Sequence, residues 1–423
     1  MTPSSALASG HPLGKRRLPV ILGVVIASTL LTYSEILLPW LPLPVPSSAL
    51  GWIFPLLAAL VFFAPLIRRP TFPTRLWLPW FFLLTYYGVT ADAANAVQRT
   101  IMLAVPLAVG AAASALRPRP TQLARFGVWM KWASVVLLLA TAIATSLLQN
   151  LQLGGITGFV TGAMTACALA CWFSARFAAD ERRALLWWGL LALVPFVALA
   201  RMATLAVVVT LPLTLAPLKW RWRLFFLSAI AFVGVTLFES PRVQAKMFYG
   251  GEGGTIADAA TGILAMLKGE GSGRFATTGR WHINSVLLEG IAEAPWLGHG
   301  ANASEAVVKE ISGMTHPHND WLRLRYDYGW VGTIVFAASM AAQVYHAVRT
   351  ARRVGGEAAI CLSAGATAFL PMALLMFTDN IILYASFFGN LHFLILGLGY
   401  AAAFVQERQG FHQTQSLPFR KGQ

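Results

Sequence analysis

Long apolar runs recur from one end of the 423-residue chain to the other, and they limit what the chain can fold into. Hydrophobic residues make up 57% of it and charged residues only 12%, which is about half the charged share of an ordinary soluble domain. A soluble core cannot bury that much apolar surface. The composition therefore predicts an all-α polytopic membrane protein and excludes a disordered, fibrous or disulfide-stapled secreted chain.

A membrane-spanning helix needs about 20 mostly apolar residues. Ten separate segments meet this requirement: 18–38, 51–67, 76–94, 98–116, 127–149, 155–178, 222–238, 326–347, 358–378 and 384–405. The stretch 184–218 carries a single charge, Arg201, and as one straight helix it would be about 52 Å long, far more than a hydrocarbon core of about 30 Å. We therefore expect two shorter spans that meet near Pro195 and Arg201, which gives about 12 transmembrane helices.

The basic residues support this count, because they fall in or beside every second connection between the spans. These residues are Lys15–Arg17, Arg68, Arg69, Arg75, Arg117, Arg119, Arg125, Lys131, Arg176, Arg182, Arg183, Lys219, Arg221, Arg223, Arg349, Arg352, Arg353, Arg408, Arg420 and Lys421. The connections 39–50 and 150–154 contain no Lys or Arg. We expect both termini to be cytoplasmic. Topology then explains most of the net charge of +15, and no nucleic-acid partner is predicted.

One connection is much longer than the others and lies on the non-cytoplasmic side. It contains nine acidic and eight basic residues, a soluble-like balance. Long loops in compact proteins are usually functional, so an active site is expected here, with a lid that carries no chemistry as the alternative. We divide the chain accordingly: spans one to nine in 1–238, a loop domain in 239–325, spans ten to twelve in 326–405 and a cytoplasmic tail in 406–423.

Two helices are expected within this loop. Residues 257–268 have the length and apolar content of an interfacial helix. Residues 281–294 form a second amphipathic pattern, with Thr277 or Thr278 available as the N-cap and Pro295 after its end.

Arg201 and Arg280 are candidate ligands of an anion. A charge at the centre of a span costs about 2.5–3.5 kcal/mol, so an intramembrane arginine suggests function, although Arg201 could also mark the turn of a hairpin and snorkel to the headgroups. Arg280 lies at the start of a predicted helix, where phosphates bind well, and Arg274 could add a second guanidinium. Several arginines at one membrane face indicate a diphosphate site.

His318 is the candidate general base. It stands where the loop meets the tenth span, and Asn319 and Asp320 follow it. A histidine near neutrality can accept a proton from a hydroxyl group, and a neighbouring amide or carboxylate can orient it. The alternative is a helix-capping cluster in which Asn319 or Asp320 is the N-cap. A zinc site is disfavoured, because the loop contains no cysteine, no HExxH motif and no histidine pair at i, i+4.

Two segments give the chain a resemblance to a known family. "TTGRWHINSVLLEGIAEAPWLGHG" (277–300) resembles the Gly-Arg, aromatic, helix, Pro-x-x-Gly-x-Gly signature of the O-antigen ligase family, with its arginine at Arg280 and its aromatic residue at Trp281. "HPHNDWLRLRYDYGW" (316–330) resembles its His-Asn segment, with the histidine at His318. His316 could share that role, but only His318 is directly followed by asparagine. The intramembrane arginine of the family corresponds to Arg201.

The resemblance implies a glycosyltransferase of the bacterial inner membrane with a periplasmic active site. It implies transfer of O-antigen glycan from undecaprenyl diphosphate to a sugar hydroxyl of the lipid A-core, among membrane lipids and with neither metal nor cofactor. His318 would be the general base of an inverting displacement, and Arg201 and Arg280 would bind the diphosphate. Asp379, at the outer end of the eleventh span, could line the cavity or form a turn.

Other functions remain open at the level of sequence. An O-antigen polymerase should have a second sizeable arginine-bearing periplasmic loop, but the only other basic residue near a non-cytoplasmic connection is Arg99, in a short one. A ligase with a protein acceptor would have the same chemistry. A transporter would show broken or charged midplane helices, often in internal repeats, and no repeat is visible. A structural scaffold would leave Arg201 and the long loop unexplained.

Overall fold

The structure is a computed structural model, and part of the chain is described in it. The described residues are 20–28 except 22 and 26, 47–63, 70–91, 95–116, 118, 120–150, 160–198, 200–249, 253–271, 273–276, 280–314 and 316–415. Most of the first predicted span, the basic residues Lys15–Arg17 and the expected N-cap at Thr277 or Thr278 lie outside these ranges.

The described chain is helical, and its only β feature is an isolated bridge between Phe248 and Phe275. Its main helices are α3 (Ser47–Phe63), α4 (Leu78–Thr90), α5 (Ala96–Ser114), α6 (Pro120–Asn150), α7 (Val160–Ala178), α8 (Ala184–Val197), α9 (Arg201–Val208), α10 (Trp220–Phe238), α11 (Pro241–Met247), α12 (Ile256–Leu267), α13 (Arg280–Glu293), α14 (Ala303–Ser312), α15 (Asp320–Ala351), α16 (Gly356–Leu375) and α17 (Asn390–Gln415). A 3₁₀ helix, η2 (Thr74–Trp77), precedes α4, and a π-helix, η3 (Ala385–Gly389), precedes α17.

Six helices in the described ranges are long and apolar enough to cross a membrane. They are α5, α6, α10, α15, α16 and α17, the last together with η3. This is the architecture of a polytopic membrane protein. The total of twelve spans stays a prediction, because several of the other predicted segments form shorter apolar helices such as α3 and α8.

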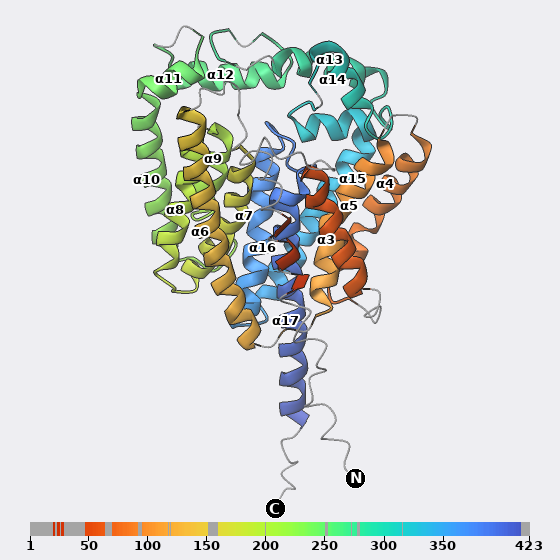
Figure 1. The fold of residues 1–423 in the computed structure, drawn as a ribbon, viewed down its shortest axis with the longest axis vertical. Helices are drawn as coiled ribbons and strands as arrows, with labels where there is room; N and C mark the ends of the chain where they lie inside the picture. The colour runs from red at the N-terminus through yellow and green to blue at the C-terminus, as the bar shows by residue number, and fades with distance from the viewer. Residues whose placement is uncertain are drawn as a thin grey trace, which may run out of the picture.

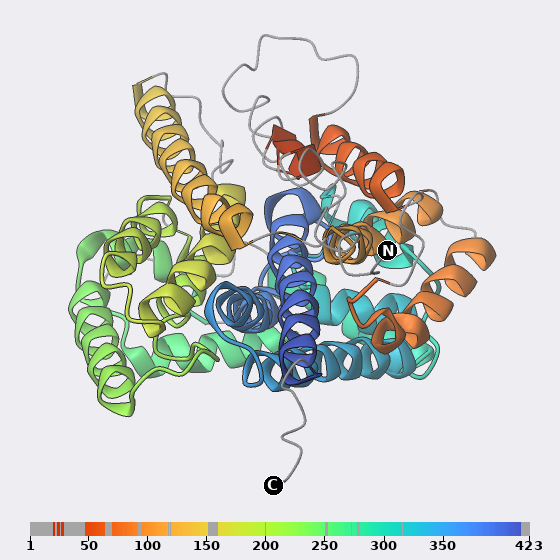
Figure 2. The same cartoon turned by 90° about the horizontal axis from the view of Figure 1, so that it is seen from below.

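The bundle is organised around α16 and α17. Their most apolar windows are 72% and 83% buried, whereas that of α10 is only 6% buried, so α10 lies at the periphery. Figure 2 shows α16 and α17 between a group formed by α6–α10 and a group formed by α3–α5. In agreement with this view, α17 packs on α5 and α16 packs on α7.

The long apolar stretch from 184 to 218 breaks into two helices, as the sequence predicts. α8 ends at Val197, α9 begins at Arg201, and the two helices pack against each other. With eight residues α9 is only about 12 Å long, so this helix alone does not cross a core of about 30 Å.

Turns and irregular backbone follow α9, and side chains satisfy their polar groups. The Arg223 guanidinium donates to the carbonyl oxygens of Pro212, at 2.7 Å, and Thr214, at 2.8 Å. The Thr367 hydroxyl oxygen accepts from the Leu215 amide at 2.9 Å. Non-helical backbone at membrane depth requires such partners, because lipid offers none. Arg223 therefore supports the backbone as well as belonging to the basic residues beside every second connection.

Helices α11–α14 gather at one end of the bundle, and the end of α17 extends from the opposite end (Figure 1). α12 and α13 occupy the places expected for the two loop helices. α12 is capped by reciprocal hydrogen bonds between Thr255 and Asp258. Helix α15 starts at Asp320, earlier than the tenth predicted span, so the first turns of this helix belong to the region of the candidate site.

Candidate functional site

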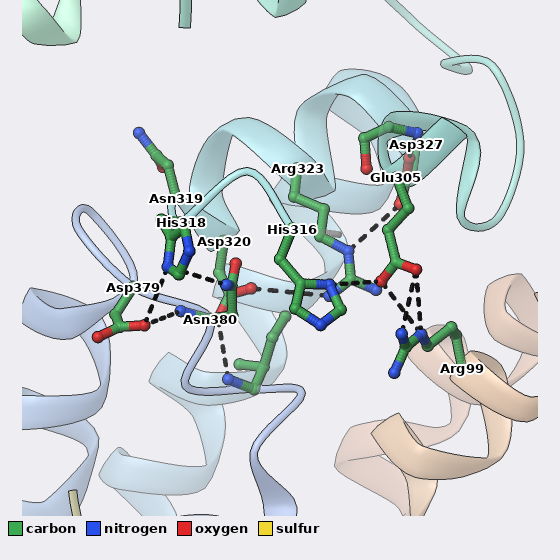
Figure 3. A network of polar contacts seen from close by, with 12 residues as sticks. Arg99, Glu305, His316, His318, Asn319, Asp320, Arg323, Asp327, Asp379 and Asn380 are labelled. Atoms are coloured by element: carbon green, nitrogen blue, oxygen red, sulfur yellow. Dashed lines mark hydrogen bonds and ion pairs between the residues drawn. The ribbon is translucent and has the colours of Figure 1, made fainter. Parts of the chain in front are cut away.

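The connection between α16 and α17 brings the candidate residues together. Within this connection, residues 378–382 contact three other parts of the chain. The Thr378 carbonyl accepts from Nη1 of Arg280 at 2.7 Å, and the Ile382 amide donates to Oδ2 of Asp320 at 2.8 Å. Oδ1 of Asp379 lies 3.6 Å from Nδ1 of His318 (Figure 3). Asp379, for which the sequence left a cavity-lining role and a simple turn open, is therefore central to the arrangement.

His318 is held in an unusual backbone conformation directly before α15. Its φ of 53° lies in the left-handed region, which few residues other than glycine adopt. The next residue, Asn319, is the N-cap of α15, and its Oδ1 accepts from the Leu322 amide at 3.0 Å. The capping role suggested by the sequence thus belongs to Asn319, whereas the His318 ring, 29% exposed, faces Asp379 and Asn380.

The surroundings of His318 favour one tautomer. The Asp379 carboxylate can only accept, so its position near Nδ1 favours a proton on that nitrogen. Nδ2 of Asn380 lies 3.3 Å from the same nitrogen, and turning this amide over places its oxygen there as an acceptor for the Nδ1 proton. With the proton on Nδ1, the lone pair of Nε2 is available to accept a proton from a hydroxyl group.

Arg201 and Arg280 form a positively charged pair, and Arg280 contacts the connection that carries Asp379. Each is the first residue of its helix, α9 and α13 respectively, and their charges interact. Nη2 of Arg201 donates to the Ala276 carbonyl at 3.2 Å. Burial lowers the pKa of Arg280, and the nearby Asp379 carboxylate opposes this change. Two partly buried guanidinium groups that repel each other make a favourable site for an anion with several oxygens.

Arg274 and Trp281 lie differently. The Arg274 side chain is exposed, and its charge acts on Asp258 in α12. Trp281 is 39% exposed and contacts His282. Neither residue shares a hydrogen bond or ion pair with the group around Asp379 in the part of the chain that the structure describes.

His316, the second histidine, belongs to a separate ionic cluster. Its Nδ1 lies 2.9 Å from Oε1 of Glu305 on α14, and Nε of Arg99 on α5 lies 3.1 Å from the same oxygen. Burial raises the pKa of Glu305, but the hydrogen bond with His316 and the charges of Arg323 and Arg99 outweigh it, so the pKa lies below its usual value. Sequence reasoning missed Glu305, because its partners are distant in the chain.

Buried ionic groups also fix the start of α15. Arg323 has a side chain only 1% exposed and lies 3.8 Å from Asp320 and 3.5 Å from Asp327. Asp320 in turn accepts from the Ile382 amide, so this residue holds the α16–α17 connection against α15. The i, i+3 and i, i+4 spacing of these three charges was the signal that could have revealed the cluster from sequence.

Comparison with protein-family models matches residues 184–337 to the O-antigen ligase family. These residues are therefore similar to the O-antigen ligase family. The match includes Arg201, Arg280 and His318 and both segments on which the resemblance rests, so that resemblance is confirmed. Members of this family are glycosyltransferase-like ligases or polymerases. The comparison with curated proteins gave no match.

Within the matched region, residues 184–337, the two family segments pack against each other through their backbones. The amides of His299 and Gly300 each donate at 2.9 Å, to the carbonyls of Tyr326 and Asp327 respectively. Gly329 interrupts the helical angles of α15 with φ 65° and ψ −167°, and a Cβ there would collide with the Trp296 carbonyl. Gly329 thus allows the loop and α15 to come into direct contact.

Gly329→Ala should therefore destabilise the folded protein. The backbone conformation alone costs a residue with a Cβ about 1–3 kcal/mol, and the collision with Trp296 adds to this. Thermal unfolding of the purified protein measures the change. Gly355→Ala is the matched control, because Gly355 has φ −126° and no atom within 4 Å of an added Cβ. An unchanged midpoint for Gly329→Ala would contradict the close contact.

Glu305→Gln should weaken the attachment of α14 to the bundle. Loss of the Glu305 carboxylate removes the negative charge that Arg99 and Arg323 share. This should lower the free energy of unfolding by about 3 kcal/mol near neutral pH. Because the folded-state pKa of Glu305 is lowered, its stabilisation is present above the usual value of 4.5 and is lost as the pH falls below it. The difference in thermal midpoint between wild type and variant should shrink in that acidic range. If this difference in thermal midpoint stayed constant with pH, the effect of Glu305→Gln would come from packing and not from the charge.

Proposed function

We propose that this protein is a lipopolysaccharide O-antigen ligase. It transfers O-antigen glycan from undecaprenyl diphosphate to a sugar hydroxyl of the lipid A-core. The observation that carries the proposal is that His318 and Arg280, from separate elements, both contact residues 378–380, while the charge of Arg201 acts on Arg280. A proton acceptor thus lies near paired guanidinium groups, which is the combination that displacement of a diphosphate requires.

The proposed reaction is a single in-line displacement with inversion at the anomeric carbon. His318 accepts the proton of the acceptor hydroxyl while its oxygen attacks, and the bond to the lipid diphosphate breaks. Negative charge grows on the leaving oxygen, and Arg201 and Arg280 stabilise it. Asp379 is a positioning residue, since its carboxylate favours the Nδ1 proton of His318 and stabilises the positive charge that the ring acquires.

The donor is already activated by its diphosphate, so the proposed mechanism needs neither a metal ion nor a nucleotide sugar. The side chains around His318 contribute a carboxylate, an amide and guanidinium groups, which act on protons and phosphate oxygens. Among the described residues no three His, Cys, Asp or Glu side chains are arranged to hold a metal ion.

We place the protein in the bacterial inner membrane with this site on the periplasmic face. Arg349, Arg352 and Arg353 lie at the end of α15, and His318 and Asp320 lie at its start. Under the positive-inside rule the basic end is cytoplasmic, which puts the site and α11–α14 on the other side. There the two lipid substrates can meet at headgroup depth.

Lipopolysaccharide gels of a deletion strain test the proposal. A ligase predicts loss of the polymer ladder while long undecaprenyl-linked chains accumulate. Loss of chain length with single units still attached would indicate a polymerase, and an intact ladder with loss of a glycoprotein would indicate a protein acceptor. A pattern unchanged in all of these respects would reject the family reaction and favour another role, such as transport.

A further inference from the structure

A cavity lies away from the site described above, between α15, α16 and the segment that follows α9. Its volume is about 940 Å³. We propose that this groove binds an anionic phospholipid from the leaflet opposite the catalytic face, with the acyl chains between the helices and the headgroup on the arginines at the end of α15. The choice of leaflet and of occupant rests on the proposed function, whereas lipid binding in the groove is measured without the transfer reaction.

The walls of the groove are apolar. The α15 residues that line it recur at helical spacing on one face of that helix, and the α16 residues do the same: Ala337, Met340, Ala341, Val344, Val348, Ala366, Phe369, Leu370 and Ala373. Leu213 and Leu215 close the third side. Such a surface matches hydrocarbon chains.

The two ends of the groove differ in chemistry. Towards the catalytic face, the Trp321 indole nitrogen donates to the Ala373 carbonyl at 3.0 Å and so joins α15 to α16. At the other end Arg349, Arg352 and Arg353 line the groove. From Ala337 to Arg352 the helix rises about 22 Å, which is enough for the hydrocarbon of one leaflet, about 15 Å, and its headgroup region.

None of the three arginines forms an ion pair with a carboxylate in the described part of the chain. By contrast, Arg176 pairs with Glu357 at 2.6 Å. Arg75 adds to the positive potential, since its charge acts on His346 together with those of Arg349 and Arg353. Topology explains a basic end, but it does not explain why these cations close an apolar groove.

Charge position decides between the possible lipid occupants. In the proposed function the donor diphosphate binds Arg201 and Arg280, at the opposite end of the bundle. The lipid tail of the donor carries no charge, so it would gain nothing from the cations at Arg349, Arg352 and Arg353. A phospholipid of the other leaflet presents its phosphate at the depth of these arginines. Basic pockets between transmembrane helices at the cytoplasmic side recognise anionic headgroups in this way.

The experiment measures binding of phosphatidylglycerol to the purified full-length protein in neutral detergent. The readout is the rise of the thermal unfolding midpoint as lipid is added. Each arginine near a headgroup contributes about 1 kcal/mol, so Arg349→Ala/Arg352→Ala should weaken the affinity about 30-fold. Ala341→Trp should also abolish binding, because it fills the groove and leaves the arginines intact. Arg182→Ala/Arg183→Ala is the matched control, since it removes two exposed charges elsewhere and should leave the affinity unchanged.

Several outcomes would overturn the proposal. Equal affinity for phosphatidylcholine would remove the role of the headgroup, and an equal loss in the Arg182/Arg183 control would show a general charge effect. Retained binding in Ala341→Trp would place the lipid elsewhere. If undecaprenyl phosphate, but not phosphatidylglycerol, bound in a manner sensitive to Ala341→Trp, the groove would hold the donor tail. Should Ala341→Trp not fold, Ala341→Leu and Ala337→Leu provide smaller fillings of the same groove.

Discussion

His318→Ala is expected to slow glycan transfer by about 10²–10⁴-fold, which is the usual contribution of a general base, while the protein still inserts and folds normally. The ring is 29% exposed and makes no backbone hydrogen bond in the described chain, so its removal should cost little stability. Transfer from a lipid-diphosphate donor by the purified protein measures the rate, and membrane levels and thermal unfolding measure folding.

His282→Ala is the matched control for this prediction, because His282 is an exposed histidine in the same loop domain, on α13. It should leave transfer unchanged. Asp379→Asn should lower the rate less than His318→Ala does, since it removes only the charge that orients the ring. His316→Ala should act mainly on stability, through Glu305. Near wild-type transfer by His318→Ala, with strong loss in His316→Ala, would move the base to His316.

Arg280→Lys is expected to lower the transfer rate strongly even though the positive charge remains. A lysine can keep the contact with the Thr378 carbonyl, but it cannot reproduce the fork of a guanidinium group on two phosphate oxygens. Loss of one charge-assisted hydrogen bond, about 1.5–3 kcal/mol, corresponds to about 10–150-fold in rate. Steady-state transfer kinetics with the lipid-linked donor give the change in kcat and KM.

Arg274→Lys is the control for that substitution. Arg274 is exposed, and its charge acts on Asp258 rather than on the group around Asp379. Replacing Arg274 by lysine should therefore change the transfer rate little. Full activity of Arg280→Lys would exclude a bidentate role for Arg280. A large loss in Arg274→Lys would require Arg274 to approach the donor when the substrate binds.

Much of the architecture could be predicted from the sequence, because it depends on local patterns. The break between α8 and α9 follows from an apolar stretch too long for one span, and α12 and α13 follow from short amphipathic patterns in the loop. The same reasoning named Arg201 and His318 separately, since a charge among apolar residues and a histidine at a helix start are both visible in one window of sequence.

The sequence by itself determined the membrane class, the position of the long loop and the family segments, because hydropathy and short motifs are properties of neighbouring residues. Only the tertiary structure decided that residues 378–382 bring Arg280, Asp320 and His318 together, and that Glu305 pairs with Arg99 on a distant helix. It also decided that α9 is too short to span the bilayer alone and needs Arg223 to satisfy the backbone that follows. These contacts join residues far apart in the chain, and their geometry depends on how the helices pack, which no local pattern encodes.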